Sequence, residues 1–547
     1  MLNMERVINY FQQLTLITKL ILGVVVLVVS LLQFATLSYK IKYYYKALFL
    51  VLIQGMVYFF FDYFHSYSLP LHIAIFALCS LVTLIFLLVT GTGIKSESVN
   101  IDPIWSVKFP IRNSSPLIMQ NIKRGIAIFG SAGSGKTESG FVPILKHAGE
   151  RNIPCLCYDY KNGEITEIAH YFFQDSKVKQ ATIIPHSPKY SDRVNPFLPK
   201  YIPTEQHLRQ QTKLIFANLK KVDNIKDSGS SFFDKIPEPT LAAVIWRLKV
   251  DYPEMCTLPH AVALCLVKTP TEIVEFISKN PYSRAIGSPL VDSLISENQV
   301  AGVKASLSLP LTDLALPTIF WVMSANDVDL DINNPDNPTF LSIVNDPRLE
   351  RINAPFISVI ISTAINSMQV RDRPGSFLLF DEGTTFYLDG ISKIPATMRS
   401  YNIATVFSTQ DRALAKENYG DVITSSLLAN LSYQMIGKAN DPESVKYYKN
   451  ISEEIEKKTV SKSFTDSVMG GDIRLSEGTR ETSKYKNQDF TGLKQGQFFV
   501  FADGKDKLYN FDLLPFKRLE LKVKHLITEK DLNDNFNRIM EDVKNIT

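Results

Sequence analysis

The sequence is poor in cysteine, with five residues in 547, and none of them has the spacing of a zinc site. Cys155 and Cys157 lie in the apolar run 153–158, where we expect them to be small core residues of a buried strand. This usage argues against a structural metal and fits a reducing cytoplasm. The sequence also has no large excess of one charge, because 59 basic and 55 acidic residues leave a net charge of only +4. The net charge by itself therefore does not indicate a nucleic-acid partner.

Charged side chains are absent from long runs near the N-terminus. Residues 20–37 carry no charge, and residues 69–90 contain only one histidine, so each run is long enough to cross a bilayer. Residues 47–61 form a shorter apolar run, which is either a third span or an apolar loop outside the membrane. We therefore predict a transmembrane anchor of two or three spans over residues 1–92. The expected location is the bacterial inner membrane, with the remaining chain in the cytoplasm.

The lysines between these runs bear on the number of spans. Lys40, Lys42 and Lys46 follow the first run, whereas residues 62–70 contain neither lysine nor arginine. Because positive loops stay in the cytoplasm, this distribution favours three spans. Arg6 and Lys19 favour two, since three spans would leave both outside.

A complete phosphate-binding loop follows the apolar run 126–129. Its glycines allow backbone N–H groups to point at a β-phosphate, Lys136 is placed to reach the β- and γ-phosphates, and Thr137 to ligate Mg²⁺. The motif predicts that the chain binds and hydrolyses ATP with Mg²⁺. The predicted nucleotide-binding residues are Gly130, Ser131, Ala132, Gly133, Ser134, Gly135, Lys136, Thr137 and Glu138.

A second apolar run, 377–380, ends in Asp381 and Glu382. Beside a phosphate-binding loop, this pattern supplies a Mg²⁺ partner and a base. We expect Asp381 to hold the metal through water and Glu382 to orient and deprotonate the attacking water. The run 404–407 leads to Gln410, a candidate γ-phosphate sensor or else an ordinary strand-end amide. Arg399 is a candidate to stabilise the transition state across a subunit boundary, or a plain surface arginine.

Short apolar runs alternate with helical stretches from residue 126 onward, which predicts an α/β fold with a largely parallel sheet. Helical periodicity replaces the strand pattern between residues 203 and 311, so we expect an all-α insertion there. The nucleotide-binding domain would then comprise residues 93–202 and 312–520, and residues 521–547 a helical tail. Thr528 is the expected N-cap of that tail helix. Residues 454–489, rich in Ser, Thr, Lys and Gly, predict a mobile loop or hairpin.

The sequence contains, from the N-terminus on, an apolar anchor, a phosphate-binding loop, a helical insertion, an acidic strand end and a strand that ends at a glutamine. This succession resembles the type IV coupling proteins of conjugation and secretion, the TraG and TraD group. The segment 159–164 is similar to that family's Asp-Pro-Lys-Gly-Glu element, although Tyr160 replaces the proline and Asn162 is an extra residue. Residues 193–196 are similar to its Asn-Pro turn, and Arg399, Tyr401, Gln410, Tyr419 and Gly420 to its succession after the acidic strand. The resemblance implies a RecA-like domain, a homo-hexameric ring, and ATP-driven delivery of relaxase-bound single-stranded DNA to the secretion channel proteins.

Two functions remain open on the sequence. The first is a DNA-translocating ATPase, which grips phosphates with basic residues on mobile loops. The second is a membrane receptor and adaptor that recruits protein substrates to a secretion channel without pumping DNA. A third reading, a chromosome-segregation translocase of the FtsK type, is disfavoured because the 24 residues after Val523 are too few for a winged-helix domain.

Overall fold

The structure, a computed structural model, describes residues 102–222, 235–294, 297–452, 454–465, 472–502 and 505–546. The chain divides into two units, Met1–Asn100 and Ile101–Thr547, and every described residue belongs to the second. Within this part of the chain, no helix is both long and apolar enough to cross a membrane. The spans predicted at residues 20–37, 47–61 and 69–90 lie outside the described residues.

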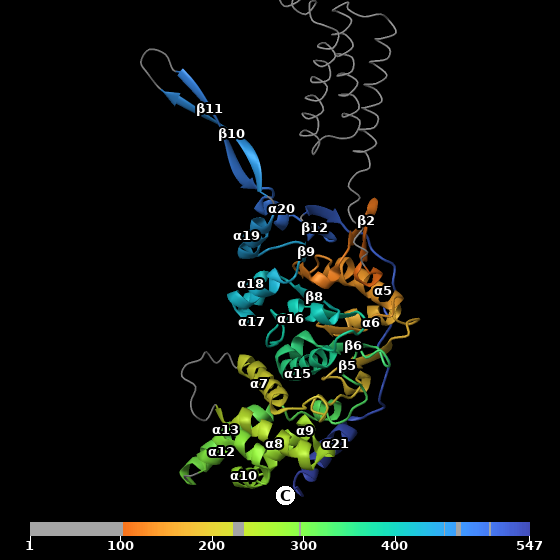
Figure 1. The fold of residues 1–547 in the computed structure, drawn as a ribbon, viewed down its shortest axis with the longest axis vertical. Helices are drawn as coiled ribbons and strands as arrows, with labels where there is room; N and C mark the ends of the chain where they lie inside the picture. Colours follow the sequence, from red (N-terminus) through yellow and green to blue (C-terminus); the bar gives the residue numbers. More distant parts are fainter. Residues whose placement is uncertain are drawn as a thin grey trace, which may run out of the picture. The chain divides into compact units, whose positions relative to one another are not determined.

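A large sheet of nine described strands forms the centre of the second unit (Figure 1). The strands are β3 (Ile126–Phe129), β4 (Cys155–Asp159), β5 (Lys179–Ile183), β6 (Thr339–Val344), β7 (Ser376–Phe380), β8 (Ile403–Thr409), β9 (Tyr433–Ile436), β12 (Gln497–Ala502) and β13 (Lys505–Asn510). Their order across the sheet is β13-β12-β9-β3-β8-β7-β4-β6-β5. The strands from β9 to β5 are parallel neighbours, whereas β12 pairs antiparallel with both β9 and β13.

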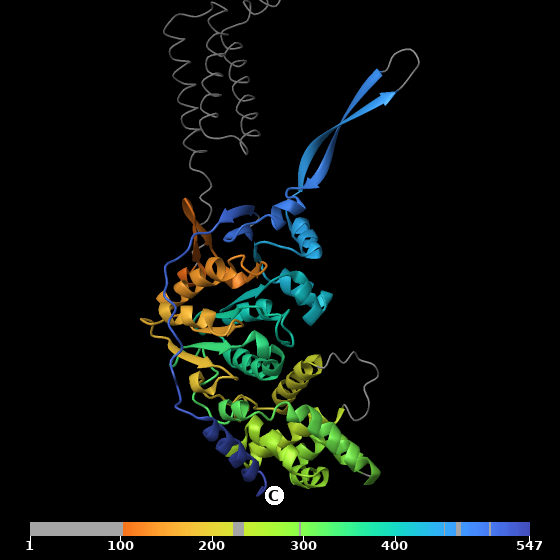
Figure 2. The same cartoon turned by 180° about the vertical axis from the view of Figure 1, so that it is seen from behind.

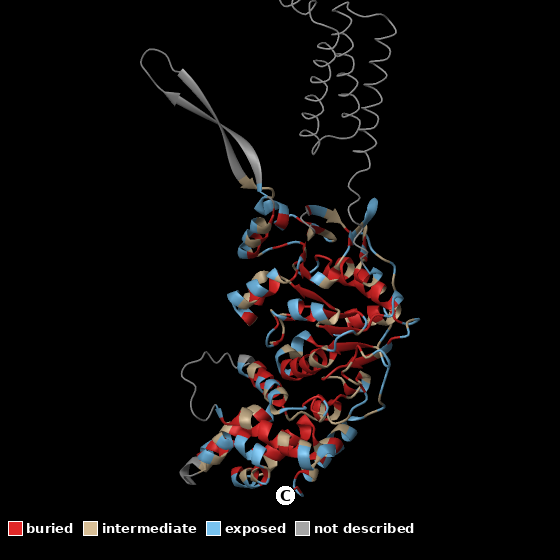
Figure 3. Ribbon diagram, viewed as in Figure 1, coloured by how far each residue is buried: buried red, intermediate tan, exposed pale blue. Residues whose placement is uncertain are grey.

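The parallel strands read as continuous apolar runs because helices cover both of their faces. One face carries α5 (Val142–Glu150) and α6 (Glu164–Phe172). The other face carries α15 (Glu350–Met368), α16 (Ile394–Met398), α17 (Arg412–Tyr419), α18 (Asp421–Ala429) and α19 (Pro442–Ile451). Figure 3 shows the resulting buried layer on each side of the sheet. The predicted α/β class with a large parallel sheet is confirmed.

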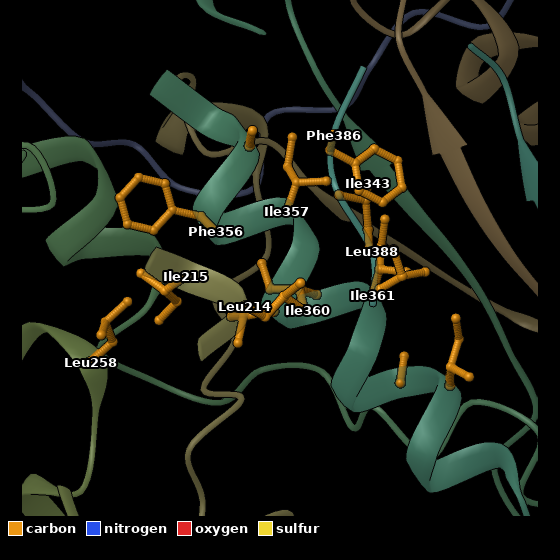
Figure 4. Close-up of a cluster of buried hydrophobic side chains, with 14 of the residues drawn as sticks. Leu214, Ile215, Leu258, Ile343, Phe356, Ile357, Ile360, Ile361, Phe386 and Leu388 are labelled. Carbon is orange, nitrogen blue, oxygen red and sulfur yellow. The ribbon is translucent and has the colours of Figure 1, made fainter. Parts of the chain in front are cut away.

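The helix α7 (Glu205–Val222) packs on α15, and their contact is the apolar cluster drawn in Figure 4. Leu214 and Ile215 of α7 meet Phe356, Ile357 and Ile360 of α15 there. The segment after β7 closes the cluster through Phe386 and Leu388, both of which are buried. This packing fixes the chain just beyond the predicted acidic pair.

Between β5 and β6 the described residues contain helices and no strand. After α7 these are α8 (Pro237–Asp251), α9 (Leu258–Val267), α10 (Pro270–Ser278), α11 (Pro281–Ile286), α12 (Ser288–Ser293), α13 (Glu297–Thr312) and α14 (Pro317–Val322). The tail helix α21 (Glu529–Asp542) packs on α9 and α14, and Thr528 is its N-cap as predicted. The apolar side chains of this segment therefore pack within the domain, with Ile539 and Val543 fully buried.

An extended segment, residues 512–527, connects β13 to α21 and is called the strap here. In Figure 2 it runs along the edge of the domain from the top of the sheet to the helices between β5 and β6. Arg518 donates to the Glu164 carboxylate at 2.6 Å, and the Leu519 amide donates to the Glu167 carbonyl at 3.1 Å. The Lys524 amide donates to the Lys189 carbonyl at 2.9 Å. The strap therefore contacts α6 and then the turn η4 (Pro188–Tyr190) after β5 before it reaches α21.

Among the described residues, two hairpins lie outside the large sheet. The first pairs β1 (Val107–Ile111) with β2 (Ser114–Met119). The second pairs β10 (Glu454–Thr465) with β11 (Asp472–Ser483) over twelve residues, and α20 (Asn487–Thr491) follows it. Of the two alternatives predicted for residues 454–489, the structure has the hairpin.

Candidate nucleotide-binding site

The phosphate-binding loop leaves the carboxyl end of β3, which lies between β9 and β8 in the parallel part of the sheet. Gly133 and Gly135 have φ angles of +75° and +90°, a region that side chains with a Cβ rarely adopt. The Gly135 position is also crowded, since a Cβ there would lie 3.1 Å from the Gly496 nitrogen. These two glycines therefore allow the tight curl that turns the backbone amides toward one point.

Thr137 begins η3 (Thr137–Phe141), a π-helical turn that leads directly into α5. Thr137 is buried and Glu138 is half-buried in this first turn. The first amides of a helix have no acceptor within the helix, so they are available to an anion placed at the loop. The local structure is therefore suited to binding a phosphate group.

Lys136 is buried and points back across the loop. Its Nζ donates to the Gly130 carbonyl at 2.6 Å and lies 2.8 Å from Oε1 of Glu382. The side chains of Lys136 and Glu382 are only 4% and 3% exposed. Residues that the sequence placed in two separate motifs therefore form one buried ion pair.

Asp381 is fully buried beside this pair. Neither of its carboxylate oxygens has a hydrogen-bond partner among the described residues. Burial raises the pKa of Asp381 to about 7; Lys161 and Lys136 act to lower it, while Glu382 and Asp159 act to raise it. A carboxylate held dry and without donors is suited to a cation or its water shell. With Thr137, Asp381 therefore fits the predicted magnesium position.

Glu382 has an unusual backbone, with φ of +49° in the left-handed region. The turn around it is held by its neighbours: the Gly383 amide donates to the Ser408 carbonyl at 2.9 Å, and the Thr385 amide donates to the Glu382 carbonyl at 3.0 Å. Gly383 itself has no room for a Cβ, which would lie 2.4 Å from the Phe407 ring. A strained residue at the base position of a site is a common feature of functional turns.

Gln410 follows β8, which lies between β3 and β7 in the sheet. Its carbonyl accepts the Gly130 amide at 3.2 Å, so Gln410 lies directly beside the phosphate-binding loop. The structure thus brings Gln410 together with the loop, Asp381 and Glu382 at the carboxyl edge.

Arg399 is exposed and lies in η8 (Arg399–Tyr401), before the amino end of β8. The seven residues of β8 separate it from that edge by about 23 Å at ~3.3 Å per residue. The structure therefore does not bring Arg399 to the site of its own chain.

Two further residues, which the sequence did not indicate, contact the phosphate-binding loop. The Lys438 carbonyl accepts the Ser131 amide at 2.8 Å, and the Gly496 amide donates to the Ser134 carbonyl at 2.9 Å. Lys438 follows β9 and Gly496 precedes β12, so the hairpin of β10 and β11 lies between them in sequence. Both contacts use backbone atoms, and no side-chain pattern in the sequence could have revealed them.

Residues 377–491 match a protein family described as the TraM recognition site of TraD and TraG. The structure is similar to a solved structure of the bacterial conjugative coupling protein TrwBdeltaN70, with a TM-score of 0.56 and 15% identity over 74% of this chain and 88% of that chain. It is also similar to the plasmid coupling protein TrwB in complex with the ATP analogue ADPNP, with a TM-score of 0.55 and 14% identity over 73% and 87% of the two chains.

TrwB in complex with ADP and Mg²⁺ gives a TM-score of 0.55 with 14% identity, again over 73% of this chain and 87% of that chain. At this level of identity these likenesses show the fold. The comparison with curated proteins found no match. The family match over residues 377–491 and the shared fold confirm the resemblance to the TraG and TraD group that the motifs indicated.

Proposed function

We propose that the protein is an ATPase that couples a relaxase-bound DNA strand to a type IV secretion channel and drives its transfer in conjugation. The observation that carries the ATPase part is the buried pair of Lys136 and Glu382, 2.8 Å apart, with Asp381 beside it. This pair joins the phosphate-binding loop to the acidic strand end, as triphosphate hydrolysis requires. The TrwB structures with ADPNP and with ADP and Mg²⁺ support nucleotide and magnesium as ligands.

In this proposal the chain positions the triphosphate through its loop. The backbone amides at the start of the helix, those of Lys136 and Thr137, bind the β-phosphate, and the Lys136 side chain turns from Glu382 toward the β- and γ-phosphates. Thr137 and Asp381 would hold Mg²⁺. When bound, the ion neutralises phosphate charge and polarises the γ-phosphate.

Once Lys136 has turned away, the Glu382 carboxylate is free to accept a proton from the attacking water. Gln410 lies between the loop and the acidic strand end, where its amide can sense the γ-phosphate. Arg399 lies at the opposite end of β8, so any contact it makes with a nucleotide is with that of a neighbouring subunit. The ring, which we propose is a homo-hexamer, is what the resemblance to the TraG and TraD group implies.

The biological part of the proposal rests on the family. The matched description concerns recognition of TraM by TraD and TraG, so we propose that residues 377–491 contact a partner of the relaxase–DNA complex. We further propose that the segment 1–92 anchors the protein in the inner membrane beside the channel proteins, with the ATPase in the cytoplasm.

The decisive experiment measures ATP hydrolysis by the full-length protein with and without single-stranded DNA. We expect DNA to stimulate turnover, and we expect the stimulation to fall with salt because phosphate contacts release counterions. Lys136→Ala should abolish hydrolysis with or without DNA. Turnover that ignores DNA at every salt concentration would contradict the translocase.

The second candidate function is a receptor and adaptor that recruits protein substrates without pumping DNA. It is favoured by the description of the matched family, which names a protein-recognition site. On this reading a protein partner stimulates ATP turnover and DNA does not. The same hydrolysis assay, run with single-stranded DNA and with a purified relaxase lacking DNA, distinguishes the two.

A further inference from the structure

A chain of three polar side chains, of which Tyr158 and Asn345 are buried and Thr385 is half-buried, leads to the backbone of Glu382. The Thr385 hydroxyl donates to the Glu382 carbonyl at 2.8 Å, and the Tyr158 hydroxyl lies 2.6 Å from the Thr385 hydroxyl. The Asn345 amide group donates to the Tyr158 hydroxyl at 3.1 Å. These residues come from the carboxyl ends of β4 and β6 and from the turn after β7, and we call them the relay.

The hydrogen positions in the relay follow from the donors available. Asn345 uses an N–H, so the Tyr158 oxygen accepts and its own proton is left for Thr385. The Thr385 hydroxyl donates its proton to the Glu382 carbonyl, so its oxygen must accept the hydrogen bond from Tyr158. All the bonds therefore run in one direction, from Asn345 to Glu382, and every member both gives and receives as buried groups require.

The far end of the relay is fixed to the fold. The Asn345 carbonyl oxygen of the side chain accepts from the Asn353 side chain at 2.9 Å and from the Asp346 amide at 2.9 Å. Asn353 belongs to α15, which also packs on Phe386, next to Thr385 (Figure 4). The relay thus connects Glu382 to the helix that covers this face of the sheet.

Glu382 needs such support because its left-handed φ of +49° is unfavourable for a residue with a side chain. A turn that relaxed to an ordinary φ would carry the carboxylate away from Lys136 and from the water it must meet. The relay bonds the carbonyl of Glu382 itself, so it opposes this rotation directly.

We propose that Tyr158, Thr385 and Asn345 are positioning residues that hold Glu382 in its productive backbone conformation. The inference rests on the proposed function, because it assigns the relay to the step in which Glu382 activates water. The relay does not touch the phosphate-binding loop, so its loss changes turnover and leaves nucleotide binding intact.

The test uses Tyr158→Phe, Thr385→Val and Thr385→Ser in the full-length protein. Each of the first two removes one hydroxyl and keeps the volume of the side chain, and we expect kcat for ATP hydrolysis to fall about 10- to 100-fold, as displaced catalytic groups do. The Kd for a fluorescent ADP analogue with Mg²⁺ should stay within about twofold of wild type, since binding does not use the relay. Thr385→Ser keeps the hydroxyl and should recover most of the activity.

A matched control is Tyr201→Phe, which removes the hydroxyl of a buried tyrosine before α7 that donates to Asp329 at 2.7 Å and accepts from the Leu330 amide at 2.8 Å. This substitution removes a tyrosine hydroxyl, as Tyr158→Phe does, but at a place that has no contact with the relay. It should therefore leave kcat unchanged. Wild-type kcat in Tyr158→Phe and Thr385→Val, or a loss of nucleotide affinity as large as the loss of kcat, would overturn the relay. Failure of Thr385→Ser to recover activity would also overturn the relay. If Tyr158→Phe does not fold, the comparison of Thr385→Val with Thr385→Ser is the deciding test.

A wild-type chain that hydrolyses no ATP in any condition would overturn the proposed function, and the catalytic role of the relay with it. An active wild type whose relay variants are unaffected would overturn the relay alone. The two failures are therefore distinguished by the wild-type measurement.

Discussion

Removing Lys136 should destabilise the protein more than removing an exposed lysine, even before any nucleotide is added. In Lys136→Met the Glu382 carboxylate, only 3% exposed, loses its partner at 2.8 Å. Breaking a buried pair in this way typically costs about 3–5 kcal/mol, because a charge remains buried without compensation. Glu382→Gln should cost less, since Lys136 keeps its bond to the Gly130 carbonyl.

The expected change in melting temperature follows from the size of the folded unit. Residues Ile101–Thr547 form one compact unit. At ~2.1 cal/mol/K per residue, its unfolding entropy is about 0.9 kcal/mol/K, so a loss of about 3 kcal/mol lowers the midpoint by about 3 °C. The double variant Lys136→Met with Glu382→Gln leaves neither member of the pair as an unpaired charge. Its melting temperature should therefore be about 2 °C higher than the losses of the two single variants, added together, would give.

The assay is calorimetry of the three variants without nucleotide, followed by titration with a fluorescent ATP analogue. Lys146→Met is the matched control, since Lys146 pairs with Glu150 on the exposed surface of α5 and such pairs contribute at most about 1 kcal/mol. Glu382→Gln should bind ATP at least as tightly as wild type, because no ion pair has to open before Lys136 reaches the phosphates. Strictly additive effects, or a loss in Lys136→Met no larger than in Lys146→Met, would refute the reasoning.

Three further predictions concern other parts of the chain. Burial and the neighbouring lysines lower the pKa of His170 from 6.5 to about 4, so its neutral form stabilises the fold above pH 6.5 and this stability is lost as pH falls toward 4. Between pH 7 and 5 the free energy of unfolding should fall by up to about 2 kcal/mol. In His170→Gln the melting temperature should therefore depend less on pH over this range. If Arg399 acts in trans, Arg399→Ala and Glu382→Gln, each nearly inactive alone, should regain ATPase activity when mixed, and no rescue in confirmed mixed rings removes Arg399 from the site. For three spans, cysteine at Ser66 should react with an impermeant thiol reagent on intact cells and cysteine at Ser38 should not, in a chain lacking its native cysteines; labelling at both positions supports two.

The sequence by itself determined the parts of the site that are local. The phosphate-binding loop is a run of consecutive residues, and its glycines, Lys136 and Thr137 act through positions fixed by the backbone of that run. The strands β3, β7 and β8 were also predictable, because each is a short apolar run buried on both faces. For β6 the run of Thr339–Val344 was missed, since a serine interrupts it and periodicity cannot separate such a run from a helix.

Only the tertiary structure decided how these local parts meet. The strand order places β8 between β3 and β7, which brings Gln410 to the loop and leaves Arg399 at the other end of the same strand. Nothing in the spacing of Tyr158, Asn345 and Thr385 indicates that their hydroxyl and amide groups converge on the Glu382 carbonyl. Local sequence fixes which groups a segment offers, whereas the order and register of parallel strands, set by burial across the whole sheet, fix which groups become neighbours.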